Sequence, residues 1–128
     1  MLFAQTIGLN TCWTGVFNRK TIPANVGVGE RIVIAIAIGY GENQGRVRKS
    51  KTYDQVTFDA SDKPYWFNYG VEMALLAPTA INQQKFEIGL NEDGSVSFTD
   101  KGGMFSKVDL GIVRYHFEVG AEYAKGES

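Results

Sequence analysis

The sequence predicts an α+β domain in which helices pack on a small, mostly antiparallel sheet. Three observations support this fold class. The chain has 128 residues, of which 44% are hydrophobic and 21% are charged, as is ordinary for one globular domain. Apolar residues recur at helical spacing near the start, the middle and the end of the chain. Between these regions lie one continuous apolar run and two alternating segments joined by a turn.

The N-terminal part is expected to contain a helix end, a loop and a strand. Residues 2–8 are predicted to be the last turns of a helix that stops near Gly8. The segment TCWTGVF, residues 11–17, is expected to be a loop, and Asn18 is expected to cap a short helix. The run RIVIAIAI, residues 31–38, predicts a central strand covered on both faces.

The C-terminal part is expected to contain a helix, a hairpin and a second helix. The first helix begins in SDKPYW with Asp62 as its cap, and Pro78 requires it to end at or before Ala77. KFEIGL and SVSFT form a hairpin around the turn NEDG. The inward residues of its first strand are expected to be Phe86, Ile88 and Leu90.

The last helix is predicted to open at Ser106, with Asp109 completing a capping-box-like pair. It has apolar residues on two sides, so we expect it to be buried between layers or against another chain. The first stripe comprises Val108, Ile112, Tyr115 and Val119. The second stripe comprises Leu110, Val113 and Phe117.

Charge and residue usage exclude several classes of function. A net charge of −1 gives no general attraction to nucleic acid, and no apolar run reaches membrane-spanning length. The single cysteine, Cys12, excludes an internal disulfide and favours a reducing, cytoplasmic location. The single histidine, His116, excludes a metal site built from several histidines. We therefore expect no nucleic-acid, membrane or metal partner.

Two stretches before residue 52 have compositions suited to binding a ligand. GLNTCWTG, residues 8–15, surrounds one tryptophan with small residues, so that backbone amides can approach a flat ligand. The alternative interpretation of the same residues is a helix C-cap followed by Trp13 as a core side chain. GRVRKSK, residues 45–51, is basic and can hold a phosphate dianion by charge-assisted hydrogen bonds. A solvated basic loop is the alternative.

A third stretch, residues 78–84, follows the middle helix. Pro78 fixes one backbone dihedral and Thr79 keeps the backbone accessible, while the amides of Asn82 and Gln84 can hydrogen-bond a heteroaromatic edge. The alternative is a helix-to-strand connector whose amides satisfy nearby backbone groups.

In content and order these stretches resemble the FMN-dependent nitroreductase family. IGLNTCWTGVFNRK, ERIVIAIAIGYG and RVRKSKTYDQV resemble the C-terminal part of the family's flavin domain. LLAPTAINQQKF resembles its Ala-Pro-Ser-Ala-x-Asn-x-Gln-Pro-Trp motif, and the similarity extends from Phe3 to Tyr123. The resemblance implies a nitroreductase-like fold, FMN as the cofactor and NADH or NADPH as the reductant.

The resemblance also implies three groups of flavin-binding residues. Those expected along the isoalloxazine ring are Trp13, Thr14 and Gly15. Those expected near the FMN phosphate are Arg46, Arg48, Lys49 and Lys51. Those expected to contact the flavin from across the family's dimer interface are Pro78, Thr79 and Asn82.

The order of the motifs resembles a subgroup in which two nitroreductase-like halves are fused. Here the Pro78 motif follows the Trp13 stretch, whereas in ordinary members it comes first. The family's N-terminal Arg-x-Ser-x-Arg segment has no counterpart, and Lys-Phe replaces Pro-Trp. We therefore expect an incomplete nitroreductase-like domain, the C-terminal part of such a protein. This partial domain is expected to span residues 1–125. It comprises the end of the flavin-binding half (1–58) and a second half-repeat (62–125), and a tail follows (126–128).

Three functions follow as hypotheses. The first is an NAD(P)H-using oxidoreductase that passes hydride through flavin N5 to a small-molecule acceptor, a nitroaromatic or a quinone. It would act as a homodimer or paired with a missing N-terminal half, and no side chain is expected to be a catalytic acid or base. The second is a non-catalytic relative that binds flavin or a phosphate ligand, or only oligomerises. The third is a binding protein for another phosphorylated small molecule.

Overall fold

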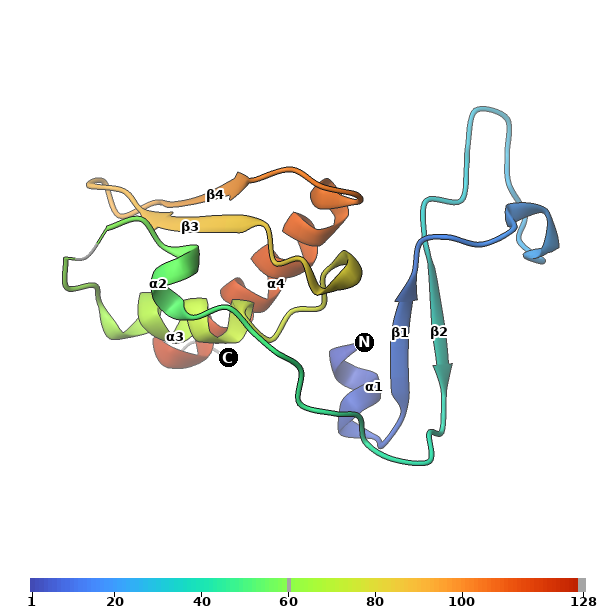
Figure 1. The fold of residues 1–128 in the computed structure, drawn as a ribbon, viewed down its shortest axis with the longest axis horizontal. Helices are drawn as coiled ribbons and strands as arrows, with labels where there is room; N and C mark the ends of the chain where they lie inside the picture. The colour runs from blue at the N-terminus through green and yellow to red at the C-terminus, as the bar shows by residue number, and fades with distance from the viewer. Residues whose placement is uncertain (60, 127–128) are drawn as a thin grey trace. The chain divides into compact units, whose positions relative to one another are not determined.

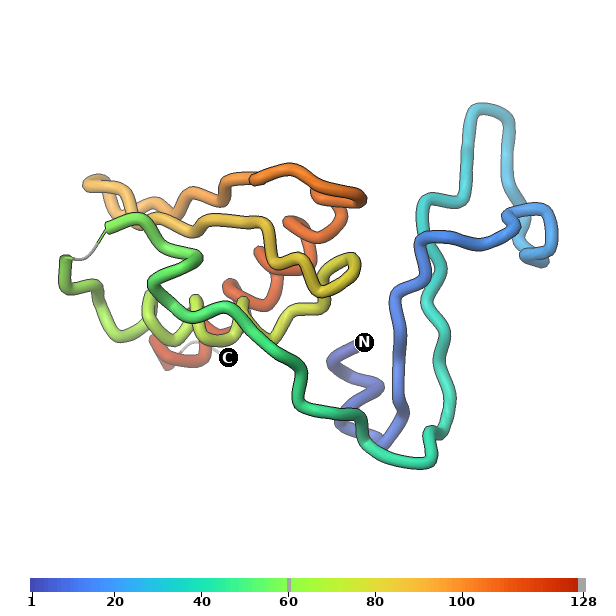
Figure 2. The backbone as a smooth tube through the Cα atoms, in the orientation of Figure 1, coloured from blue at the N-terminus to red at the C-terminus, as the bar shows by residue number. Residues whose placement is uncertain are grey.

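The computed structural model describes residues 1–59 and 61–126, and its ribbon and backbone path are shown in Figures 1 and 2. The chain divides into two compact units, residues 1–48 (unit 1) and residues 49–128 (unit 2). Each unit combines helix with its own two-stranded antiparallel sheet, which confirms the predicted α+β class. The predicted tail ends outside the described residues, at positions 127–128.

Unit 1 consists of a short helix, a strand pair and one 3-10 turn. Its elements are α1 (Leu2–Thr6), β1 (Asn10–Thr14), η1 (Arg19–Thr21) and β2 (Ala35–Gly39). The two strands pair from Asn10 opposite Gly39. Asn18 caps η1 as predicted, because its side-chain oxygen accepts a hydrogen bond from the Lys20 N–H at 3.1 Å.

Two predictions for unit 1 are wrong. Most of the expected loop at 11–17 lies in strand β1, where Thr and Trp side chains suit extended backbone. The expected central strand at 31–38 is extended only from Ala35 and has β1 as its partner in the described sheet. Its Ile36 and Ile38 side chains are 45% and 62% exposed. The apolar, β-branched residues therefore predicted that a strand forms here. They did not predict whether other elements cover its faces, because that depends on tertiary packing.

Unit 2 contains the helices and hairpin that the C-terminal part of the sequence predicts. Its elements are α2 (Tyr53–Val56), α3 (Tyr65–Ala74), η2 (Ala80–Asn82), β3 (Phe86–Leu90), β4 (Val96–Asp100) and α4 (Ser106–Ala124). The hairpin prediction is confirmed, since β3 pairs antiparallel with β4 and the Asn91 N–H donates to the Ser95 carbonyl at 2.8 Å. In Figure 1 this hairpin lies across α3 and α4, so the unit has two layers.

The core of unit 2 lies between the hairpin and the two long helices. Phe67 and Val71 of α3, Ile88 of β3 and Val113 of α4 are fully buried there. The two helices approach closely because Gly70 has no side chain; a Cβ there would lie 2.6 Å from the Phe117 ring. This packing fixes the ends of α3 and α4, and the candidate site lies next to those ends.

The last helix begins at Ser106 as predicted, but both capping predictions in unit 2 are wrong. Asp62 does not cap α3, whose N-cap is Pro64 without a side-chain hydrogen bond. Asp109 forms no capping box with Ser106, because the N-cap of α4 is Phe105 and the Ser106 hydroxyl donates to Asp100 at 2.9 Å. The Asp109 carboxylate binds a different part of the chain, as described below.

One of the two apolar faces predicted for α4 is buried within unit 2, and burial of the other against another chain stays a prediction. Val113 and Phe117 of the second stripe are buried against α3 and the hairpin. In the first stripe Tyr115 and Val119 are 59% and 41% exposed. Within residues 1–59 and 61–126, no helix is long and apolar enough to cross a bilayer.

Candidate functional site

The loop after α3 has a backbone that its residues do not favour. Ile81, Asn82 and Gln84 have φ values of 47°, 54° and 45°, in the left-handed region. A left-handed residue other than glycine or asparagine costs roughly 1–2 kcal/mol, so the strain falls on Gln84 and above all on the β-branched Ile81 rather than on Asn82. Figure 2 shows the chain turning through this segment, between α3 and β3. The unfavourable conformation persists only because neighbouring groups hold it.

Gln84 is the first of these anchors. Its side chain is 2% exposed, and its Oε1 accepts a hydrogen bond from the Lys51 N–H at 2.8 Å. Its Nε2 donates to the Ser50 hydroxyl at 3.1 Å and to the Leu75 carbonyl at 3.3 Å. The Lys51 ammonium donates in turn to the Gln84 carbonyl at 2.8 Å. The expectation that the Gln84 amide faces a ligand is therefore wrong, because this amide is used inside the fold.

Asn82 is the second anchor. Its Nδ2 donates to the Lys49 carbonyl at 2.7 Å, and nearby the Gln84 N–H donates to the Thr79 hydroxyl at 3.1 Å. The structure thus brings together the five predicted site residues of unit 2, which come from segments about 30 positions apart in sequence. They are Lys49, Lys51, Pro78, Thr79 and Asn82.

Asp109 of α4 is the third anchor, and the sequence analysis did not assign it to the site. Its side chain is 8% exposed. Its Oδ1 accepts a hydrogen bond from the Ala80 N–H at 2.9 Å, and its Oδ2 accepts one from Gln83 Nε2 at 2.7 Å. Gln83 Nε2 also donates to the Met104 carbonyl at 2.8 Å. The sequence shows an acidic residue in the first turn of α4. Its hydrogen-bond partners lie 26 and 29 positions away, so the sequence alone did not reveal them.

The two lysines differ in how they are held. The Lys51 ammonium already donates to the Gln84 carbonyl, but an ammonium has three N–H donors and retains capacity for an anion. The Lys49 side chain is exposed, while its backbone carbonyl receives the Asn82 amide. The Lys51 ammonium therefore lies beside the strained loop, and the backbone of Lys49 lies there as well.

Unit 1 contains the predicted ring contacts. Trp13 and Thr14 lie on β1 opposite Ile36 and Ala35, and Gly15 follows the strand. The Trp13 Nε1–H is buried and has no hydrogen-bond partner in the described part of the chain. Leaving such a donor unsatisfied costs about 1–3 kcal/mol, and a ligand oxygen or nitrogen would satisfy it.

The arginines of the basic stretch also belong to unit 1. Arg46 is exposed, whereas Arg48 is half-buried and its guanidinium pKa is lowered by desolvation. The boundary between the units therefore falls within the stretch 45–51. Arg46 and Arg48 belong to unit 1, and Lys49 and Lys51 belong to unit 2.

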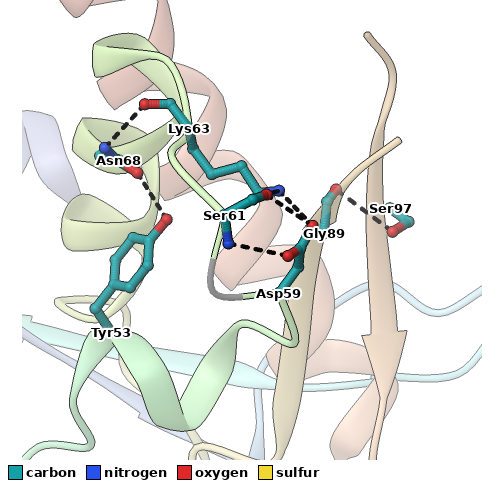
Figure 3. Close-up of polar contacts among 7 residues, drawn as sticks. All are labelled: Tyr53, Asp59, Ser61, Lys63, Asn68, Gly89 and Ser97. Atoms are coloured by element: carbon teal, nitrogen blue, oxygen red, sulfur yellow. Dashed lines mark hydrogen bonds and ion pairs between the residues drawn. The ribbon is translucent and has the colours of Figure 1, made fainter. Parts of the chain in front are cut away.

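A second polar cluster in unit 2 lies around Lys63 (Figure 3). The Lys63 ammonium donates to Asp59 Oδ2 at 2.7 Å, and the Ser61 N–H and hydroxyl donate to the same carboxylate at 3.0 and 2.9 Å. These hydrogen bonds lower the pKa of Asp59 to about 2. The Tyr53 hydroxyl donates to Asn68 at 2.6 Å. These side chains line a hollow of about 340 Å³. Among residues 1–59 and 61–126, no group of acidic, histidine and cysteine side chains could hold a metal ion.

Comparison with known proteins adds two findings. The sequence model of a family described as "putative TM nitroreductase" matches residues 1–121. A crystal structure titled as a "putative nitroreductase" from Thermotoga maritima matches with a TM-score of 0.75 and 25% sequence identity. No curated protein matches the chain. The match to the Thermotoga structure covers 99% of this chain and 52% of the other, so the chain spans about half the length of that protein.

Proposed function

The chain belongs to the family described as "putative TM nitroreductase", and on this premise we propose that it acts in an FMN-dependent oxidoreductase. The reductant would be NADH or NADPH, and the acceptor a nitroaromatic or a quinone. The observation that carries the proposal is the junction of the strained loop 78–84 with the lysine segment 49–51. It combines cationic donors with an accessible, firmly held backbone. The fusion of two halves stays a prediction.

The donor set of the chain fits FMN. Lys49 and Lys51 supply ammonium groups suited to a phosphate dianion, and Arg46 adds an exposed guanidinium. The Trp13 Nε1–H is buried and unsatisfied, and it could donate a hydrogen bond to an acceptor atom at the edge of a heteroaromatic ring. Thr14 and Gly15 follow Trp13 directly in the chain, and Arg48 completes the four cations of the basic stretch.

The proposed division of labour is that of a cofactor enzyme. When bound, FMN supplies hydride transfer at its N5 atom. The residues of the chain bind and orient it: the cations hold the phosphate, and Pro78, Thr79 and Asn82 present backbone and side chain to the flavin. No side chain is assigned the role of catalytic acid or base.

The proposal is tested by titrating the purified chain with FMN and following flavin fluorescence. We expect quenching on binding, and bleaching of the bound flavin when NADH or NADPH is added without oxygen. Unchanged absorbance and fluorescence at high micromolar FMN would exclude an FMN site in this chain.

The phosphate contacts are tested with a pair of ligands. Lys49→Ala combined with Lys51→Ala should weaken FMN binding by at least about tenfold and riboflavin binding far less, since each charged contact is worth about 1.5–3 kcal/mol. Lys20→Ala combined with Lys107→Ala removes the same charge from exposed positions outside the stretch and should change neither. Equal weakening of FMN and riboflavin would remove the lysines from the phosphate site.

A specific observation also favours self-association. Tyr115, Val119 and Tyr123 lie four residues apart along α4, and all three are more than 40% exposed. We propose that this face pairs with a second copy of the chain, as the expected homodimer requires. Sedimentation equilibrium should show a dimer that Tyr115→Lys with Val119→Lys dissociates. An unchanged mass for the variant would exclude this face.

A further inference from the structure

The loop 78–84 is held from outside by polar groups. It has three residues in left-handed backbone, and Ile81 at its crest is 82% exposed. The Ile81 side chain therefore gains little from burial in the fold. Glycine would adopt the same φ without strain. An exposed, strained segment anchored at several points is a pattern found where a conformation is needed for binding.

Among the loop's anchors, Asp109 has the position and chemistry to control the conformation. It is a carboxylate, and it uses both oxygens on the loop, one on the Ala80 N–H and one on Gln83 Nε2. Charged acceptors form the stronger hydrogen bonds. Asp109 lies on α4, whose packing against α3 is fixed by the core. It thus connects the rigid part of unit 2 to the two loop positions that flank Ile81 and Asn82.

The contacts of Asp109 distinguish its role from those of the proposed flavin contacts. Its described hydrogen bonds go to Ala80 and Gln83, and it is nearly buried. It therefore acts through the loop. The Lys49 and Lys51 pair, by contrast, offers charge directly to a ligand.

We propose that Asp109 is a positioning residue that holds the 78–84 loop in its left-handed form and thereby sets the affinity for the isoalloxazine ring. This inference rests on the proposed FMN function. If only the held conformation binds, the apparent Kd rises by the factor by which the population of that conformation falls.

The first experiment compares ligands. Asp109→Ala should raise the Kd for FMN and the Kd for riboflavin by the same factor, roughly tenfold, because the ring contact is common to both. The lysine double variant should weaken FMN much more than riboflavin, although loss of the Lys51 bond to the Gln84 carbonyl gives riboflavin a small share of the effect. Val113→Ala is the matched control: it lies one turn further along α4, is fully buried and touches the core, so it lowers stability without releasing the loop. An Asp109→Ala chain that binds both ligands as tightly as Val113→Ala would overturn the inference.

The second experiment uses a rescue that a general loss of stability would not show. Asp109→Asn keeps the shape but places an amide donor against the donor of Gln83. Adding Gln83→Glu restores a donor–acceptor pair with residue 109 and the net charge, but it loses the donor to the Met104 carbonyl. The double variant should therefore recover part of the riboflavin affinity. Failure of the double variant to improve on Asp109→Asn, with both chains folded by circular dichroism, would count against the clamp.

A third measurement needs no flavin. Hydrogen exchange of the Ala80 amide, which donates to Asp109, should accelerate at least about tenfold in Asp109→Ala, which has no acceptor for it, while the amides of β3 keep their protection. If the wild-type chain does not bind FMN, the proposed function fails, and so does the affinity role of Asp109. If the wild-type chain binds FMN and Ala80 exchange is unchanged in the variant, the inference fails and the proposed function stands.

Discussion

The two units have comparable apolar stretches but bury very different shares of them. In unit 2, Phe67, Val71 and Ile88 are 0% exposed. Within residues 1–48, all of which the structure describes, Ala4 is the one buried residue, at 7% exposure. Unit 2 therefore has a hydrophobic core of its own. Because burial of apolar surface is the main stabilising term in folding, most of the stability of the chain should come from this unit. A strand-forming sequence therefore makes a strand in both units, but only unit 2 supplies the layer that covers it.

The largest expected effect comes from a pair of isoleucines. Ile88→Ala removes a fully buried side chain of β3 and should lower the free energy of unfolding by about 2–5 kcal/mol. Ile38→Ala removes a side chain of β2 that is 62% exposed and should change it by less than about 0.5 kcal/mol. Urea unfolding followed by circular dichroism measures both. A large loss for Ile38→Ala would mean that β2 is covered in solution.

A pair of glycines sharpens the same contrast. Gly70→Ala puts a methyl group against the Phe117 ring and should cost about 1–3 kcal/mol through overpacking. Gly39→Ala in β2 meets nothing within 4 Å and should be within about 0.5 kcal/mol of wild type. Thermal melts of the two variants compare them directly. Equal shifts would show that the helices of unit 2 can separate to accept the methyl group.

A smaller effect of opposite sign is expected in the two units at left-handed positions. Ile81→Gly should raise the free energy of unfolding by about 1 kcal/mol, because glycine adopts φ of 47° without strain. Gly8→Ala in unit 1, where φ is 80°, should lower it by about 1 kcal/mol. The midpoint of urea unfolding, followed by circular dichroism, measures both changes. Destabilisation by Ile81→Gly would mean that the Ile81 side chain packs within the fold.

The smallest effect concerns an exposed ion pair of unit 2. The Lys63 ammonium and Ser61 lower the pKa of Asp59 from 3.8 to about 2, so the folded state favours the carboxylate. This contribution is present at pH 5 and above and is lost as the pH falls through about 2. Asp59→Asn should therefore be slightly less stable than wild type at pH 7 and approach it only below pH 2. A difference that does not shrink between pH 5 and pH 2 would assign the effect to another interaction.

Local patterns predicted most of unit 2. The spacing of Phe67, Val71 and Ala74 identified α3, and the letters NEDG identified the hairpin turn. Helix α2 was not predicted, although Thr52 and Gln55 have the spacing of a capping box and the Thr52 N–H donates to Gln55 Oε1 at 2.9 Å. The number of layers over β2 could not be predicted, because no local letter records what packs on a strand.

The candidate site was predictable only in part, and for the same reason. Resemblance placed Lys51 and Thr79 in one site, and the structure brings the two segments together through Gln84. The roles of Gln84 and Asp109 depend on partners roughly 30 positions away, so local rules gave both residues the wrong partners. Polar residues with distant partners need a fold before their contacts can be assigned.

The separation of these partners has a kinetic consequence. The hairpin closes over a few residues. The hydrogen bond from the Lys51 N–H to Gln84 and the one from the Asn82 amide to the Lys49 carbonyl each span 33 positions. Contacts of long sequence separation form late in folding, and exposed segments open first in the native state. The loop should therefore be a separate, weakly cooperative unit that fluctuates while the core stays intact. A bound ligand would first be seen as slower opening of residues 79–84, before any rise in the melting temperature.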